Sequence, residues 1–350
     1  MKTTLVILLL IGVVIGLVWV YKPVKAKVTP AIRYPLTSQN RDQWFGLAHL
    51  QIEPPLDRHR HGDLQLYPIY ASQTFILHHR PLGPYTSLQD GLAQKKLLIT
   101  EITGETPGRS NASSSVESDN AEVNRLFVEN ISADTVIILG GEVIRGGKQD
   151  RMIAQDFMVM PHSGKVDINV FCVEHARWTP DEDVMYEFNQ AMDVAPSKVR
   201  KAANTKKGQG KVWEEVEVLN ESFDTKTATG TLADAINDEE MMINVKAYKD
   251  QLEKINWPEN VVGVVAIRGN EVVGLDIFAQ ASLFRNYYPS LLSSYCSDVH
   301  EASHDKLKSF EEVQALFSEL ISSEEAIERY VVEQGTQLKQ GRNRIHLAGY

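Results

Sequence analysis

The sequence predicts an α+β fold, with a β-rich sandwich or barrel-like N-terminal half and an α/β C-terminal half that ends in long helices. Two patterns lead to this prediction. Up to about residue 173, short apolar and β-branched runs alternate with Gly, Pro and Asn breaks, as in sandwiches and barrels. Beyond residue 230, helical periodicity surrounds a single strand pair. With 350 residues, of which 43% are hydrophobic, the chain is long enough for about two domains.

The N-terminus carries the uncharged apolar run Leu5–Tyr21. This run is long for the apolar part of a signal peptide and at the short limit for a membrane span. We therefore assign residues 1–28 to a membrane anchor or a cleaved signal segment. Either assignment directs the chain to a membrane. We expect a membrane-anchored protein whose soluble part is extracytoplasmic, either periplasmic or at the cell surface.

Residues 29–190 are predicted to form the β-rich domain. Residues 104–120 interrupt it with a Gly-, Ser- and Asn-rich stretch whose only large apolar residue is Val116, which predicts a flexible surface insertion. Ser87 is a plausible N-cap for a short helix over residues 87–95. The predicted strands are Leu64–Tyr70, Gln73–His79, Lys96–Ile102, Thr135–Leu139, Phe157–Met160 and Val166–Val173.

Residues 191–302 are predicted to form an α/β part of the same domain, followed by a helical extension over residues 303–350. Gly269-Asn270 is a good hairpin turn, because both residues tolerate positive φ. The amphipathic pattern of Ser309–Gln334 predicts one helix. The other predicted elements are the helices Leu232–Ile255 and Ala281–Ala302 and the strands Val261–Ile267 and Glu271–Ile277.

Composition excludes several classes of protein. A formal net charge of −10 argues against nucleic-acid binding, which requires a cationic face. The two cysteines, Cys172 and Cys296, are too far apart for a CxxC motif, and whether they form a disulfide stays open. His59 and His61 share a strand face, but no carboxylate follows at ligand spacing. We therefore expect no metal site and no cofactor.

The most informative stretch spans residues 139–178. Gly146-Gly147 predicts a two-residue hairpin turn, which would place Glu142 opposite Arg151 as a cross-strand ion pair. Arg145 and Lys148 would then lie together on the other face and repel each other unless an anion joins them. That anion could be the Glu174 carboxylate or a bound phosphate or carboxylate ligand. The glycines and the lysine do not form a phosphate-binding P-loop, because Glu142 stands where that motif needs Gly.

Three short patterns in this stretch resemble the ARPP-1 family, a bacterial domain family of unknown function. They are Gly141-Glu142, then Gly146-Gly147-Lys148-Gln149-Asp150-Arg151, then Cys172-Val173-Glu174-His175-x-Arg177-Trp178. The family name refers to genomic association with ADP-ribosylglycohydrolase and rhodanese-phosphatase genes. The resemblance covers residues 85–300 and departs from the usual pattern at Asp150, where the family has Asn. It implies a shared site region but no established chemistry.

Three functions are compatible with these residues, and the sequence does not decide whether the protein is an enzyme. The first is a membrane-tethered binding or regulatory module for a small anionic ligand or a protein partner. The second is a hydrolase of a phosphorylated or ADP-ribosylated substrate, with Glu142 or Glu174 as the general base. The third is a purely structural domain. The candidate ligand-binding residues are Arg145, Lys148, Gln149, Arg151, Arg177, Trp178, Arg200 and Trp213.

Overall fold

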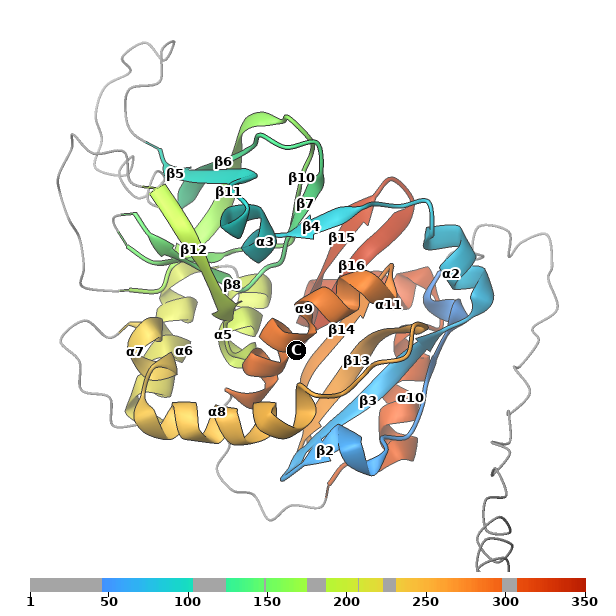
Figure 1. Ribbon diagram of the computed structural model, residues 1–350. Helices are drawn as coiled ribbons and strands as arrows, with labels where there is room; N and C mark the ends of the chain where they lie inside the picture. Colours follow the sequence, from blue (N-terminus) through green and yellow to red (C-terminus); the bar gives the residue numbers. More distant parts are fainter. Residues whose placement is uncertain are drawn as a thin grey trace, which may run out of the picture. The chain divides into compact units, whose positions relative to one another are not determined.

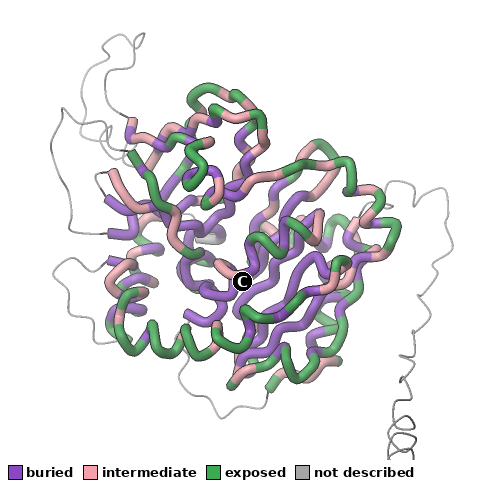
Figure 2. Tube along the Cα trace, viewed as in Figure 1, coloured by how far each residue is buried: buried purple, intermediate pink, exposed green. Residues whose placement is uncertain are grey.

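The computed structural model describes residues 46–102, 124–147, 149–174, 187–206, 208–222, 231–297 and 307–350. The predicted N-terminal segment 1–28 and the predicted insertion 104–120 lie outside these residues. Residues 42–350 belong to one unit, in which a large sheet and a barrel lie side by side (Figure 1). Buried positions concentrate in the strands of both (Figure 2). The predicted α+β class with a barrel-like part is confirmed.

The large sheet has seven strands, all paired antiparallel. Six follow the spatial order β1-β3-β13-β14-β16-β15, and β2 pairs with β3. The predicted turn at Gly269-Asn270 is confirmed, because Arg268 pairs with Glu271 across it. The strands are β1 (Leu50–Ile52), β2 (Arg60–His61), β3 (Leu64–Ala71), β13 (Val261–Arg268), β14 (Glu271–Phe278), β15 (Gly335–Gln340) and β16 (Asn343–Gly349).

Helices cover both faces of this sheet (Figure 1). On one face, Val264 and Ala266 of β13 belong to the same apolar core as Phe284 of α9 (Ala281–Cys296). On the other face, Val265 and Ile267 share a core with α10 (Phe310–Leu320) and α11 (Glu324–Gln334). This double coverage explains why β13 reads as a continuous apolar run.

The second β structure is a closed barrel with the order β11-β6-β5-β12-β8-β9. Its interior holds apolar residues that alternate along each strand, such as Ile99, Val128, Ile144 and Val170. Closure leaves no unpaired strand edge in the ring. The strands are β5 (Leu97–Glu101), β6 (Arg125–Asn130), β8 (Glu142–Gly146), β9 (Arg151–Ile153), β11 (Gly164–Cys172) and β12 (Glu187–Val194).

Smaller elements complete the unit. A three-stranded sheet with the order β10-β7-β4 consists of β4 (Tyr85–Ser87), β7 (Thr135–Ile138) and β10 (Phe157–Val159). Val199 of helix α5 (Ser197–Lys201) and Val216 of helix α6 (Gln209–Ser222) pack on the outer face of β8 and β9, against Val143 and Met152. The remaining helices are η2 (Leu47–His49), η3 (Asp57–His59), α2 (Gln73–His79), α3 (Leu88–Ala93), α5 (Ser197–Lys201), the π-helical η4 (Ala202–Lys206), α6 (Gln209–Ser222), α7 (Leu232–Ile236) and α8 (Glu239–Leu252).

Several expectations about secondary structure are wrong. The predicted single helices Leu232–Ile255 and Ser309–Gln334 are each two helices in the structure. Residues 73–79 form helix α2 instead of a strand, because Ser72 Oγ accepts a hydrogen bond from the Phe75 N–H and so caps a helix. The C-terminal part is not a purely helical extension. Ser323 caps a second helix, α11, and the chain then returns as β15 and β16, with β16 pairing to β14. Residues 335–349 are therefore part of the main sheet.

The expectation of a membrane-anchored protein with an extracytoplasmic body is contradicted. Among the helices of the described residues, none is long and apolar enough to cross a membrane. The run 5–21, on which the expectation was based, lies outside those residues.

Candidate functional site

Residues 142–153 form the strand pair β8–β9, but not in the predicted register. Ile144 pairs with Arg151, so the predicted cross-strand pair of Glu142 with Arg151 is wrong. Gly146 belongs to β8 and pairs with Phe188 of β12, where a Cβ would lie 2.6 Å from the Glu187 carbonyl oxygen. Because β12 approaches this closely, Gly146 stays in the barrel wall and the turn lies further along the chain.

The Arg151 side chain faces the interior at one end of the barrel. Strand alternation places Arg151 on the same side as Ile153, and Glu101 on the same side as Ile99. Both isoleucines belong to the apolar interior. Arg151 begins β9 and Glu101 ends β5, so this charged pair lies at the mouth of the barrel. Segments 103–123 and 175–186, which follow β5 and β11, lie outside the described residues.

We call Glu101, Gln149, Asp150, Arg151 and Glu174 the Arg151 cluster; all five are buried. Arg151 has no exposed surface, and its Nη1 donates to Gln149 Oε1 at 3.2 Å. Gln149 Nε2 donates to the Glu174 carbonyl oxygen at 2.9 Å. Glu174 Oε2 in turn accepts from the Asp150 N–H at 3.1 Å. These bonds fix the chain between β8 and β9 against the end of β11.

Arg151 keeps hydrogen-bond donors that the described residues do not use. Its Nε and Nη2 have no hydrogen-bond acceptor among those residues. Nη2 lies 3.6 Å from Glu101 Oε1, which is an ion pair but too long for a hydrogen bond. Nε–H and Nη2–H point from the same edge of the guanidinium, and this edge binds carboxylate or phosphate oxygens in parallel. Since buried polar groups are normally paired, this edge is suited to a ligand.

The structure brings together three of the eight predicted ligand-binding residues. Arg145 Nε lies 3.5 Å from Asp150 Oδ2, so Arg145 joins Gln149 and Arg151 at the cluster. Trp213 is half-buried on α6, one turn beyond Gln209. Gln209 holds β11 through two hydrogen bonds to the backbone of Cys172, of 2.8 Å and 2.7 Å. Lys148, Arg177 and Trp178 lie outside the described residues.

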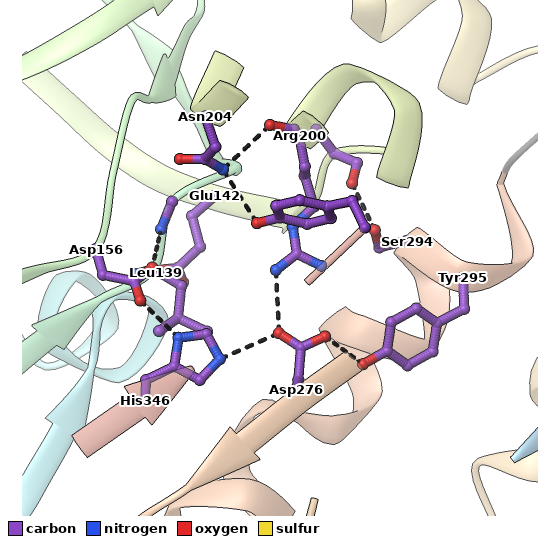
Figure 3. Close-up of polar contacts among 12 residues, drawn as sticks. Leu139, Glu142, Asp156, Arg200, Asn204, Asp276, Ser294, Tyr295 and His346 are labelled. Carbon is purple, nitrogen blue, oxygen red and sulfur yellow. Dashed lines mark hydrogen bonds and ion pairs between the residues drawn. The ribbon is translucent and has the colours of Figure 1, made fainter. Parts of the chain in front are cut away.

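Arg200 lies elsewhere, in a second polar group that joins the barrel to the large sheet (Figure 3). Its Nη2 donates to Asp276 Oδ1 at 3.1 Å, and Tyr295 donates to Asp276 Oδ2 at 2.5 Å. His346 lies between two carboxylates, 2.7 Å from Asp156 Oδ2 and 3.1 Å from Asp276 Oδ1. We call Glu142, Asp156, Arg200, Asp276, Tyr295 and His346 the Arg200 network.

Backbone features hold Arg200 in this position. Gly141 has a φ of +95°, and a Cβ there would lie 2.6 Å from Arg200 Cγ. The arginine therefore packs directly on the Gly141 backbone. The π-helical turn η4 follows, and its Asn204 Nδ2 donates to the Arg200 carbonyl oxygen at 3.1 Å and to the Tyr350 hydroxyl at 3.0 Å. The guanidinium carbon lies 4.7 Å from the centre of the Tyr350 ring, a cation–π contact.

The charges of the Arg200 network balance one another. Burial would lower the pKa of His346, but the carboxylates of Asp156 and Asp276 outweigh it and raise that pKa to about 9. Burial would raise the pKa of Asp276, yet Arg200 and His346 hold it below its usual value. The cations Arg200 and His346 therefore face the carboxylates of Asp156 and Asp276. Arg200, Asp276 and His346 have no exposed surface.

Glu142 is the neutral member of this network. Burial, reinforced by the nearby Asp156 carboxylate, raises its pKa to about 8. Its Oε2 accepts a hydrogen bond from the Leu139 N–H at 2.6 Å. A carboxyl with this pKa is mostly protonated at neutral pH, so it is poorly suited to the role of general base. Glu174 is committed to the Asp150 N–H, which likewise suits a positioning role.

Sequence reasoning missed Asp156, Asp276, Tyr295 and His346. Asp276 lies in the otherwise apolar part Val272–Phe278 of β14, and His346 in the otherwise apolar part Ile345–Gly349 of β16. A polar residue within a buried apolar run is the signal that could have found them. Asp156 gave no such signal, because it lies in a short connection between β9 and β10. Within the described residues, no group of three or more His, Cys, Asp and Glu is arranged to hold a metal ion.

Comparison with protein families gives a match to the ARPP-1 model, described as the ARG and Rhodanese-Phosphatase-superfamily-associated Protein domain, over residues 50–349. The match extends beyond the 85–300 range of the sequence resemblance and includes the C-terminal strands. No curated protein and no solved structure shows significant similarity to the chain.

Proposed function

The chain belongs to the ARPP-1 family, and from this premise we propose that it is a binding module for a small anionic ligand at the Arg151 cluster. The observation that carries the proposal is the unused Nε and Nη2 edge of Arg151. An ionised side chain buried without full pairing is destabilising. An oxyanion on this edge would supply the missing acceptors.

The position of the cluster supports the same function. Mouths of β-barrels are common ligand sites, because a rigid ring of strands holds the side chains in place. Here β5, β9 and β11 end or begin at the cluster, and buried hydrogen bonds from Gln149 and Glu174 fix the chain beside Arg151. The guanidinium is therefore preorganised, which lowers the entropy loss on binding.

The charge of the region is also compatible with an anion. Glu101, Asp150 and Glu174 are acidic, while Arg145 and Arg151 are cationic. The sequence adds Lys148 between Gly147 and Gln149, and Arg177 three residues after Glu174. Residues 142–177 contain five Lys and Arg and five Asp and Glu, so this stretch carries no net negative charge, unlike the chain as a whole. We expect the ligand to be a phosphate or carboxylate group, which the flat guanidinium edge binds with two parallel bonds.

Binding can be tested on the full chain by thermal shift and calorimetry, with inorganic phosphate and ADP-ribose as probes. A ligand that binds only the folded state raises the melting temperature. Arg151→Lys keeps the charge but removes the two-donor edge, so we expect binding to weaken roughly 10- to 100-fold. The matched control is Arg125→Lys, a half-exposed arginine of β6 that pairs with Asp167. Its binding should be unchanged.

Two results would refute the proposal. One is the absence of any thermal shift with millimolar phosphate or ADP-ribose. The other is equal binding by wild type and Arg151→Lys. If Arg151→Lys lowers the melting temperature while no probe binds wild type, the cluster has a purely structural role.

The hydrolase alternative can be tested with the same samples. We expect no turnover of ADP-ribose or of a phosphate ester, because Glu142 is largely protonated at neutral pH and Glu174 is hydrogen-bonded to backbone. Release of inorganic phosphate that disappears in Glu174→Gln would instead establish the enzyme.

A further inference from the structure

A cavity of about 210 Å³ lies between the large sheet and the helices α10 and α11. The sheet contributes Val265 and Leu275, α10 contributes Val313 and Phe317, and all four side chains are buried. The space opens to solvent past the exposed residues Leu316, Glu319 and Glu333, so it is a pocket with a buried apolar floor on the face of the sheet opposite α9.

Water is a poor occupant of this cavity. Its volume corresponds to about seven waters at their volume in the liquid. A buried water needs two to four polar partners, and the buried residues that line the pocket, apart from Tyr350, are valine, leucine, phenylalanine and alanine. Apolar cavities of about 150 Å³ can stay dry and bind benzene. The space is thus large enough for a small ring system.

The charged residues at the mouth of the cavity favour neutral apolar ligands over anionic ones. The exposed residues that line the cavity include Glu319 and Glu333 against a single cation, Arg329. Deeper in, burial raises the pKa of Tyr330 to about 12, so its phenol is neutral. An anionic ligand such as a fatty acid would meet a net negative mouth and have no buried cation to pair with along these walls.

We propose that this cavity is a second binding site, which takes a small neutral apolar molecule, an aromatic or branched skeleton of roughly six to ten non-hydrogen atoms. It is distinct from the Arg151 cluster, which lies in the barrel, and its ligand chemistry is opposite. The proposal does not depend on anion binding at the barrel mouth.

The test uses the full chain and indole as the neutral probe, measured by calorimetry and thermal shift. We expect indole to bind wild type and to raise its melting temperature. Ala326 lines the cavity from α11 and is buried, so Ala326→Leu should fill the space and weaken indole binding at least about tenfold. Val332→Leu also introduces a leucine on the same helix, but Val332 is 75% exposed and does not line the cavity. It should bind as wild type does.

Further arms keep the test decisive. Leu316→Trp fills the cavity from the half-exposed side of α10 and replaces Ala326→Leu if that variant does not fold. Indole-3-acetate should bind at least about tenfold more weakly than indole, because it carries a negative charge. Arg151→Lys should bind indole normally. The proposal is overturned if indole does not bind wild type, if both filled variants bind it equally well, or if the anion binds as tightly as indole.

Discussion

Asp156 and His346 are 190 residues apart in the chain, yet Asp156 Oδ2 lies 2.7 Å from His346 Nδ1 with both side chains buried. Asp156 follows β9 of the barrel, and His346 lies in β16 of the large sheet. The second imidazole nitrogen faces Asp276. With a carboxylate on each side, both nitrogens donate, so the ring is held as the imidazolium ion. This ion joins the two β structures.

Replacing His346 should therefore destabilise the fold strongly. His346→Gln leaves the Asp156 carboxylate buried without its cation, and breaking a buried pair in this way costs about 3–5 kcal/mol. Urea unfolding would measure the loss. The double variant Asp156→Asn/His346→Gln removes both charges and should recover a clear part of it. Strictly additive losses would contradict a direct coupling of the two residues.

Glu142 should tolerate the loss of its ionisable proton. Its raised pKa of about 8 keeps the carboxyl protonated in the folded state. At about pH 4, where the unfolded carboxyl is also largely protonated, Glu142→Gln should change the free energy of unfolding by less than about 1 kcal/mol. At pH 7 the same variant should be more stable than wild type, because glutamine has no proton to lose on unfolding. The amide oxygen can still accept from the Leu139 N–H. Glu142→Ala leaves that buried N–H unpaired and should cost about 1–3 kcal/mol. If the glutamine and alanine variants lose the same amount, the carboxylate form of Glu142 is the one that stabilises the fold.

Stability should fall as pH rises from about 6.5 to 9. The folded-state pKa of His346, about 9, lies above its ordinary value of 6.5, and that of Glu142, about 8, lies above its ordinary value of 4.5. Between the two pKa values of each group, the folded state keeps a proton that the unfolded state has lost. The contribution of that proton to the free energy of unfolding is therefore complete below the unfolded-state pKa and is lost as the pH rises to the folded-state pKa. The slope is at most about 1.4 kcal/mol per pH unit for each proton.

Denaturant titrations at a series of pH values would measure this dependence. Glu142→Gln removes one of the two protons and should flatten the curve between pH 4.5 and 8. A wild-type stability that rises from pH 6.5 to 9 is incompatible with the protonated states assigned here.

Gly141 should not accept a side chain. Its φ of +95° disfavours any L residue, and an added Cβ would lie 2.6 Å from Arg200 Cγ. We expect Gly141→Ala to lower the free energy of unfolding by at least about 2 kcal/mol. Gly210 is the matched control, because it lies in α6 and a Cβ there meets nothing within 4 Å. Gly210→Ala should be neutral or stabilising by about 0.5 kcal/mol. Equal losses in both variants would exclude steric contact with Arg200 as the cause.

The mixed α+β class could be predicted because it depends on local patterns. The turn at Gly269-Asn270 and the strands on either side of it were placed correctly, since positive φ and apolar runs leave a clear sequence signal. The register of β8 against β9 was not predicted correctly, although the paired residues are close in the sequence. It depends on the approach of β12 to Gly146, a contact that no pattern within residues 139–178 contains.

The candidate site shows the same division. The sequence by itself determined the family and the α+β class, and it led to the prediction of a site within residues 139–178, because these follow from residue types and short spacings. Only the tertiary structure separated Arg151, inside the barrel mouth, from Arg200, which joins the barrel to the sheet through Asp276. Both arginines look alike in the sequence. Their partners differ because pairing depends on residues brought together by strand order, and contacts between residues distant in the chain leave no local sequence signal.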